Sequence, residues 1–402
     1  MRLNIISVLF PLVFFKYFTD INIEMIQYMD GIGLRWPLPE IKHMLPIGIS
    51  FYTFMAIGYT IDVYNEEIKA EKNIGILALF ISFFPLILSG PIERAKNMIP
   101  QFKSLNAIDF NSLSQGLRFI LWGYFMKLVV ADRIGIYVDT IFINFQQHNG
   151  STIMFASFLY PFQLYTDLGG YSLIAIGVSK VLGISVMHNF NRPFFASSMS
   201  EFWRRWHISL ISWLTDYLYT PLSFYFRSYK VWGIVIALMI TFIISGIWHG
   251  AAMTFVVWGL LQGVFLSIEA LSNNSKNEIE KKYNLKKRIW YNILGITITF
   301  VLFAVSQIFG RSNNLEMAVN ILTRIFSTSG ALFIGPPSNF IYIIVGLLMV
   351  LLKDFADEYY PSKFQLFDNS NKIIRIFSFS LIFITILIIG VFDGGQFIYF
   401  QF

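Results

Sequence analysis

The chain has no cysteine, and charged side chains make up only 13% of its 402 residues. The missing cysteine excludes disulfide bonds, thiolate metal ligands, S-palmitoylation and a cysteine nucleophile. Hydrophobic residues make up 55% of the chain and aromatic residues 18%, and the mean hydropathy is +0.60. Soluble domains contain about 25% charged residues, so this composition predicts an integral membrane protein in contact with the lipid bilayer.

About ten apolar stretches are long enough, or nearly so, to cross the hydrocarbon core, which takes about 20 helical residues. They predict an all-α, polytopic membrane protein in which residues 1–402 form a single transmembrane domain. The stretch from Thr152 is the least regular, because its centre carries the string YTDLGGYS. The expected spans are Asn4 to Phe18, Met44 to Tyr64, Ile74 to Gly90, Gly116 to Arg133, Thr152 to Leu182, Val231 to Ile247, Ala251 to Leu271, Ile289 to Gly310, Asn339 to Leu352 and Ile374 to Phe392.

The loop charges orient these spans, because short cytoplasmic loops retain Lys and Arg whereas exported loops lose them. One set of alternate loops collects nearly all the basic residues, including the Lys-rich string EKKYNLKKR. The other set holds only Lys69, Lys72, Arg311 and Arg324. The pattern predicts that Met1 lies outside and the Lys-rich loop inside. The net charge of +6 is explained by this topology, and we expect no nucleic-acid partner.

His249 stands in the string SGIWHGA, with long apolar stretches on both sides. Ionisable residues inside a membrane are costly and usually face a bundle interior or a wet cavity. Burial disfavours the charged imidazole, so this side chain is suited to accept a proton from a hydroxyl group. The alternative is a neutral imidazole that only forms hydrogen bonds between helices. The spacing of the histidines and the absence of cysteine predict no metal site.

The segment between Ser197 and Phe226 is dense in aromatic side chains, Arg and His. At helical spacing, Trp203, Trp206, Leu210 and Trp213 form an apolar stripe, with Ser198 or Ser200 near the start of the helix. One interpretation is an amphipathic helix in the membrane interface, whose Arg pair contacts phosphates. The other is a helix tilted into the protein with His207 facing a central cavity. Asp62 and Asp167 are further carboxylates in or beside apolar segments.

Seven blocks, spread over nearly the whole chain, resemble the membrane-bound O-acyltransferase family. The similarity is strongest to its bacterial alginate and peptidoglycan O-acetylation branch and weaker to the teichoic-acid D-alanylation protein DltB. The blocks are LPIGISFYTF, YTIDVY, FFPLILSGPIERAKNMIPQF, GYFMKLVVAD, NFNRPFFASSMSEFWRRWHISLISWLTDYLYTPL, SGIWHGAAMTFVVWG and FIYFQF.

The resemblance implies a ring of about ten helices around a thin central floor, with cavities from both membrane faces. It implies that His249 is the catalytic residue and His207 a second important one. The donor would be cytoplasmic acetyl-coenzyme A, with no bound cofactor, and the acceptor an extracytoplasmic polysaccharide or an exported SGNH-type O-acetyltransferase. The expected membrane is the bacterial cytoplasmic (inner) membrane. Expected substrate-binding residues are Trp206, Asn189, Arg204, Arg205 and Trp248.

Members of this family are commonly some tens of residues longer at the front, so we expect the first one or two helices of the family to be missing. Three alternatives remain open. The first is D-alanyl transfer in the manner of DltB. The second is a transporter or flippase, which would usually show paired halves with broken helices, although the sequence has no visible repeat. The third is a non-catalytic scaffold for an exported acetyltransferase.

Overall fold

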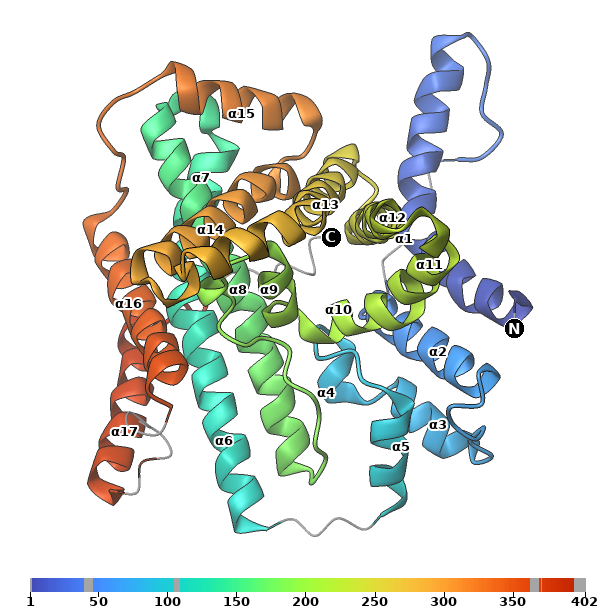
Figure 1. The fold of residues 1–402 in the computed structure, drawn as a ribbon, viewed down its shortest axis with the longest axis horizontal. Coiled ribbons are helices and arrows are strands. Elements are labelled where there is room, and N and C mark those ends of the chain that lie inside the picture. Colours follow the sequence, from blue (N-terminus) through green and yellow to red (C-terminus); the bar gives the residue numbers. More distant parts are fainter. Residues whose placement is uncertain (1, 40–45, 105–108, 362–368, 370, 394–402) are drawn as a thin grey trace.

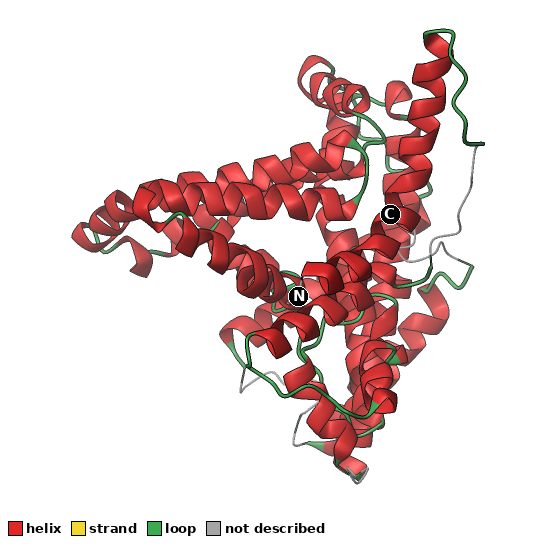
Figure 2. Cartoon of the chain, turned by 90° about the vertical axis from the view of Figure 1, so that its right-hand side faces the viewer, coloured by secondary structure: helices red, strands yellow, loops and turns green. Residues whose placement is uncertain are grey.

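A computed structural model describes residues 2–39, 46–104, 109–361, 369 and 371–393. Over these ranges the chain folds into helices and loops, without a strand, and the helices cross one another in several directions (Figure 2). The all-helical prediction is confirmed for this part of the chain.

Five helices of the described part are long and apolar enough to cross a membrane, and α1 (Arg2–Gly31), whose two halves are bent by 43°, is a sixth if it counts as one span. The five helices overlap the last five predicted spans, and α1 contains the first predicted span. The predicted number of about ten spans is not reached by this criterion. The five are α12 (Val231–His249), α13 (Met253–Lys282), α14 (Ile289–Arg311), α16 (Pro337–Tyr359) and α17 (Lys372–Ile389).

The span predicted from Ile74 to Gly90 is wrong as a single helix. It forms two short helices, α3 (Ile74–Ile81) and α4 (Phe84–Ile87), separated at Ser82 and Phe83. Phe83 is extended, and Pro85 follows in the first turn of α4. Proline is tolerated in a first turn but breaks a helix interior, because it lacks the backbone N–H. The span predicted from Met44 is the helix α2 (Ile49–Tyr64), and Met44 itself lies outside the described residues.

The central helix α8 (Gly150–Val181) is continuous through the polar string that made its prediction uncertain. It packs on a helix that runs from α6 (Phe110–Tyr124) through a π-helical segment, 125–131, into α7 (Asp132–Ile143). Lys127 in the π-helical segment pairs with Asp167 of α8 at 2.5 Å and with Asp132 at 2.8 Å. A buried cation is thus compensated by two carboxylates, as buried charges require.

Glycine allows α6 and α8 to approach closely. A Cβ atom on Gly123 would lie 2.5 Å from the carbonyl oxygen of Gly170, and one on Gly177 would lie 2.5 Å from that of Gly116. Such small-residue contacts let helix backbones meet where lipid supplies no hydrophobic driving force. These contacts hold α8 against α6, and the candidate site described below lies beside α8.

Two short helices, α9 (Met199–Arg205) and α10 (Ile208–Leu214), lie near the middle of the molecule, with α8, α12, α13 and α4 around them (Figure 1). Trp203 and Trp206 belong to one hydrophobic core, beside α8 and α14. Leu210 and Trp213 belong to a second core, beside α2 and α5 (Ala95–Lys103). The chain therefore passes from one core to the other between α9 and α10. The remaining described α-helices are α11 (Thr220–Tyr225) and α15 (Leu315–Ser327).

Candidate active site

The predicted apolar stripe does not lie on one helix, because the chain breaks at His207. Trp206 is extended, and His207 adopts the left-handed conformation with φ 46° and ψ 50°, immediately before α10 begins. A left-handed residue with a side chain costs about 1–2 kcal/mol. The prediction of one interfacial amphipathic helix is therefore wrong. Because His207 is only 4% exposed, the structure agrees with the other interpretation, in which this segment enters the protein.

The segment before α9 holds this break in place by pairing with both sides of it. The carbonyl of Asn189 accepts from the N–H of Ile208 at 2.8 Å, and the N–H of Asn191 donates to the carbonyl of Arg205 at 2.8 Å. The side chain of Asn189 accepts from the N–H and hydroxyl of Ser209, at 3.1 and 2.9 Å, and donates to Ser172 at 3.1 Å. Asn189 was predicted to bind substrate; its side chain supports the break beside His207, and the residue also lines the large cavity described below.

His249 is the last residue of α12, and Gly250 after it is extended. Its ring packs edge to face against Trp258, with ring centroids 4.9 Å apart, and against Trp248 at 4.8 Å. Both histidines line one small chamber of about 60 Å³. A water molecule needs about 10–15 Å³ by a comparable measure, so this chamber holds a few waters or one small group. It is lined by Tyr160, Leu164, Leu168, Trp203, Trp206, His207, Leu210, Ser245, His249, Phe255, Trp258, Gln307 and Gly310.

Sequence reasoning missed several chamber residues. Trp203 and Trp258 are 5% and 6% exposed, and no acceptor in the described ranges lies within hydrogen-bond distance of either indole N–H. Trp203 fits the apolar stripe of its segment and Trp258 stands in an apolar stretch, so only the folded chain identifies them as donors at the site. Trp248, predicted to bind substrate, is not part of the chamber lining and stacks on Phe54, with ring centroids 5.1 Å apart.

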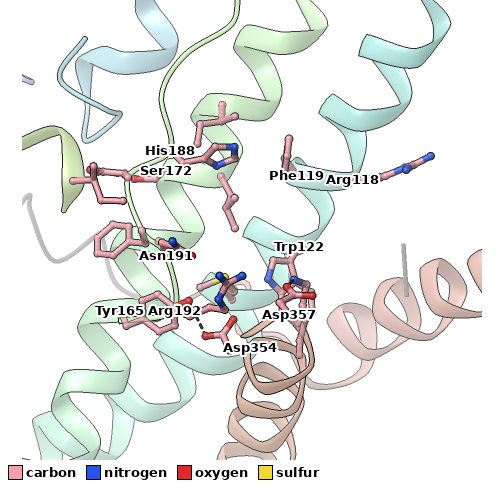
Figure 3. A pocket seen from close by; sticks show the side chains of 18 of the residues that line it. Arg118, Phe119, Trp122, Tyr165, Ser172, His188, Asn191, Arg192, Asp354 and Asp357 are labelled. Carbon is pink, nitrogen blue, oxygen red and sulfur yellow. Dashed lines mark hydrogen bonds and ion pairs between the residues drawn. The ribbon is translucent and has the colours of Figure 1, made fainter. Parts of the chain in front are cut away.

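A second, larger cavity of about 660 Å³ lies between α6, α8, α16 and the segment 188–192 (Figure 3). Its lining mixes aromatic and charged side chains, and Figure 3 shows Arg192 beside Asp354 and Tyr165. Three cations contribute to it, namely Arg118, Arg192 and Lys353. The orientation predicted from loop charges assigns this cavity to the cytoplasmic side and the chamber to the opposite side.

The two cavities are separated by side chains of the two linings that contact each other. Tyr165 of α8 lines the large cavity, whereas Leu164 and Leu168 of the same helix line the chamber. Phe190 lines the large cavity, and its ring centroid lies 5.2 Å from that of Trp206 and 6.0 Å from that of His207. Each of these ring contacts reaches from one cavity lining to the other. We call these side chains the partition, and His207 is part of it.

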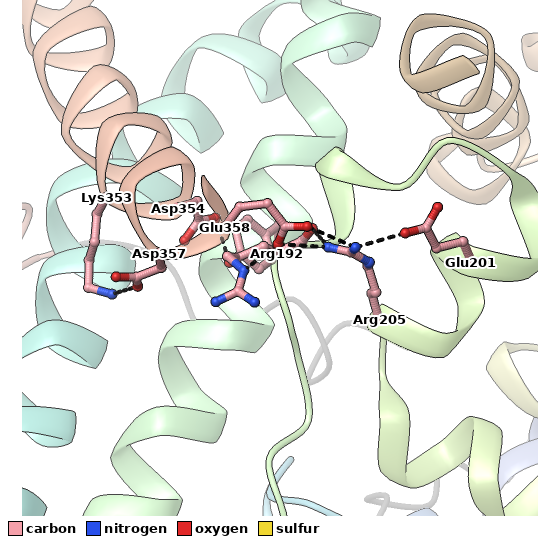
Figure 4. Close-up of polar contacts among 8 residues, drawn as sticks. Arg192, Glu201, Arg205, Lys353, Asp354, Asp357 and Glu358 are labelled. Carbon is pink, nitrogen blue, oxygen red and sulfur yellow. Dashed lines mark hydrogen bonds and ion pairs between the residues drawn. The ribbon is translucent and has the colours of Figure 1, made fainter. Parts of the chain in front are cut away.

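The predicted Arg pair divides into two different environments. Arg205 pairs with Glu201 at 2.7 Å and with Glu358 at 2.9 Å, and Glu358 also pairs with Arg192 at 2.7 Å (Figure 4). Arg204 is exposed and lies beside a separate cavity of about 260 Å³. Neither Arg204 nor Arg205 lines the large cavity or the chamber.

This ion network changes the acidity of its members on α9. Burial raises the pKa of Glu201, but hydrogen bonds from the backbone and hydroxyl of Ser197 and the charge of Arg205 outweigh burial, so this pKa lies below its usual range. Burial lowers the pKa of Arg205, whereas Glu358 and Glu201 raise it, and the net shift is upward. Glu201 and Arg205 therefore stay charged at neutral pH, and the pair of Arg205 with Glu358 connects α9 to the end of α16.

A helical membrane protein with two histidines in a small internal chamber, separated by a thin partition from a larger polar cavity, has the features of a protein that transfers a proton or a chemical group within the bilayer. The sequence profile of the membrane-bound O-acyltransferase family matches residues 62–306. The chain belongs to this family, and the matched region contains both histidines.

Curated relatives carry three related names. "Probable alginate O-acetylase AlgI" from Pseudomonas syringae pv. tomato is 35% identical over 327 residues, which cover 81% of this chain and 60% of the relative. "Peptidoglycan O-acetyltransferase" from Helicobacter pylori is 32% identical over 82% of this chain and 64% of the relative. "Teichoic acid D-alanyltransferase" from Streptococcus thermophilus is 32% identical over 63% of this chain. The chain thus spans about 60% of the length of the first two relatives.

Proposed function

We propose that this protein is an O-acyltransferase that moves an acetyl group from a cytoplasmic donor, acetyl-coenzyme A, to an extracytoplasmic polysaccharide or an exported SGNH-type acetyltransferase. The observation that carries the proposal is the partition, which has the large cavity on one side and, on the other, the chamber that both histidines line. Family membership and the names of the relatives support the same chemistry. The proposed location is the bacterial cytoplasmic membrane, with the chain folded as one domain of the ring type.

The donor is an anion too large to cross the bilayer, whereas its acetyl group is small. Arg118, Arg192 and Lys353 line the large cavity and outnumber its carboxylates, Asp354 and Asp357, so the lining has an excess of positive charge for the phosphates of the donor. Lys353 also pairs with Asp357, and Arg192 pairs with Glu358. The acetyl thioester would then extend toward the partition, where Phe190 and Trp206 meet. Only the acetyl group has to pass the partition, because the carrier remains in the large cavity.

In the proposed reaction, an acceptor hydroxyl in the chamber attacks the thioester carbonyl carbon, and His249 takes the hydroxyl proton. The C–S bond breaks, and the departing thiolate receives the proton held by His249. This transfer restores the neutral imidazole. The indole N–H groups of Trp203 and Trp258 supply donors for the oxyanion, because they line the chamber and no described residue accepts from them.

The function is tested by measuring acetyl esters in cell-envelope glycans of the source organism with the gene intact, deleted, or restored as the wild type or His249→Ala. We expect one polymer to lose its acetyl esters on deletion and to regain them only with the wild-type protein. Unchanged ester content in every fraction contradicts the proposal. Restoration by His249→Ala identifies a non-catalytic scaffold instead.

D-alanyl transfer is the second candidate, because the Streptococcus thermophilus relative is named for it. The same strains distinguish the two reactions, since D-alanyl esters release D-alanine on mild alkaline hydrolysis whereas acetyl esters release acetate. Loss of D-alanine without loss of acetate on deletion would favour this second candidate.

A further inference from the structure

The helix α1 carries Lys16 and Tyr17 within an apolar sequence, and both side chains are half-buried. A charged residue in such a stretch is costly unless it finds a partner. In Figure 1, α1 lies beside α12, the helix that ends in His249. The two side chains therefore lie close to the proposed catalytic residue although more than two hundred positions separate them in the sequence.

Both side chains hydrogen-bond to the C-terminal end of α12. The Lys16 ammonium donates to the carbonyl of Trp248 and lies 5.5 Å from the centroid of the Trp248 ring. The Tyr17 hydroxyl donates to the carbonyl of Ile247 at 2.6 Å. These two carbonyls belong to the two residues directly before His249.

A helix end needs such partners for physical reasons. The last four carbonyls of a helix have no intrahelical donor, and in a membrane each unsatisfied group costs several kcal/mol. A cation at a helix C-terminus also interacts favourably with the helix dipole. Lys16 supplies both a donor and a positive charge, and Tyr17 supplies a second donor. The two side chains of α1 therefore cap the C-terminal end of α12, just before Gly250.

We propose that Lys16 and Tyr17 are positioning residues that set the location of the His249 ring in the chamber. The inference rests on the proposed function, because it assigns these residues to the same reaction. A displaced Trp248 carbonyl moves the next residue directly, and the Trp248 ring, packed 4.8 Å from the His249 ring and 5.1 Å from Phe54, transmits the same displacement.

The test compares Lys16→Met, Lys16→Arg and Tyr17→Phe with the wild type in the purified full chain. The assay is release of free thiol from acetyl-coenzyme A, with cell-envelope glycan of the source organism added as the acetyl acceptor. Lys16→Met removes the donor and the charge, and we expect kcat to fall on the order of tenfold to a hundredfold, as for displaced catalytic groups. KM for acetyl-coenzyme A stays within about twofold of wild type, because α1 does not line the large cavity. Lys16→Arg restores most of kcat, and Tyr17→Phe has a smaller effect.

The matched controls are Lys72→Met, in an exposed loop, and Tyr28→Phe, an exposed tyrosine of the same helix. Both keep wild-type kcat. Rates are expressed per folded molecule, so a variant that only lowers the folded fraction retains wild-type kcat and contradicts the positioning role. If Lys16→Met does not fold, Lys16→Arg and Tyr17→Phe decide the question.

A second readout does not depend on turnover. Diethyl pyrocarbonate modifies accessible neutral imidazoles, and peptide mass spectrometry gives the rate at His249 and at the distant His148 of the same molecule. We expect the rate at His249 to change at least severalfold in Lys16→Met, with an unchanged rate at His148. Unchanged rates at both residues, with wild-type kcat, overturn the inference. If wild type and His249→Ala both lack turnover, the proposed function fails, while the modification rates still test the positioning of His249.

Discussion

His207 and His249 line the same chamber but are held there in different ways. His207 sits at a break between two short helices, with a left-handed backbone that the segment around Asn189 fixes from both sides. His249 sits at the regular end of a long helix, whose last carbonyls are bound by residues of α1. His207 is also part of the partition, whereas His249 lines the chamber only.

The difference indicates a division of labour. A ring fixed by a strained backbone inside the core is suited to shape the passage between the cavities, because its position is determined by many contacts. A ring at a helix end, beside the chamber alone, is suited to exchange a proton with a group that enters the chamber. Substitutions at the two positions should therefore differ in their effects on stability and turnover.

The largest effect is expected for His249→Ala. Loss of a general base lowers the rate by about 10²–10⁴-fold, with the protein still folded and inserted, because a helix end tolerates alanine. Acetyl transfer per folded molecule is the measurement, with His148→Ala as the matched control. Turnover within about twofold of wild type in His249→Ala contradicts the catalytic role.

Two substitutions of His207 separate the contribution of the imidazole ring from the cost of the left-handed backbone. We expect both His207→Ala and His207→Gly to lose most of the transfer activity, since each lacks the imidazole. Glycine adopts the left-handed conformation without the steric cost, so His207→Gly should be more stable than His207→Ala by about 1 kcal/mol. The midpoint of thermal aggregation in detergent compares them. Equal or reversed stability would show that the break at His207 is not maintained in the protein.

Asn189→Ala tests the support of His207 without touching either histidine. The substitution leaves Ser172 and the Ser209 N–H without the partners they have here, and buried groups left unsatisfied cost about 1–3 kcal/mol. Thermal stability should fall accordingly, and turnover should fall with it. Asn191→Ala is the matched control, because Asn191 lines the same large cavity as Asn189 but contributes to the break through its backbone. A similar loss in both variants would contradict the role of the Asn189 side chain.

The smallest effects are expected for substitutions of Arg204 and Arg205, and they also test the sequence prediction made for this pair. Arg205→Met breaks pairs with two partly buried carboxylates and should cost about 1–2 kcal/mol, whereas Arg204→Met should be nearly neutral. Because the pKa of Glu201 is lowered by folding, its contribution is present above about pH 4.3, the unfolded value, and is lost as the pH falls below it. Stability profiles of both variants against pH provide the check. A larger effect of Arg204→Met than of Arg205→Met on KM for the donor would support the predicted substrate-binding role of Arg204.

The sequence predicted the long apolar helices well, because α12, α13 and α14 are specified by composition over many residues. It failed where a local backbone choice depends on distant partners. The periodicity of Trp203, Trp206, Leu210 and Trp213 is helical, yet the pairing of 189–191 with both sides of His207 breaks the helix. No local sequence pattern predicts that pairing.

The candidate site was predictable only in part. His249 was found because an ionisable residue between apolar stretches is conspicuous, and His207 because the family resemblance implied its importance; the structure brings them into one chamber. Trp203 and Trp258 resemble core residues in sequence, and only the folded chain shows that no described residue accepts a hydrogen bond from their N–H groups. Lys16 is a single charge in an apolar stretch, but its partner at the end of α12 is too distant in sequence to be inferred.

The central claim is that two cavities approach the same partition from opposite sides of the membrane. Because the chain has no cysteine, Gln307→Cys in the chamber and Gln115→Cys in the large cavity each provide a single thiol, which a membrane-impermeant methanethiosulfonate can label in intact cells or in inside-out vesicles. We predict that Gln307→Cys is labelled only from outside and Gln115→Cys only from the cytoplasmic side. Labelling of both thiols from the same side would contradict the account.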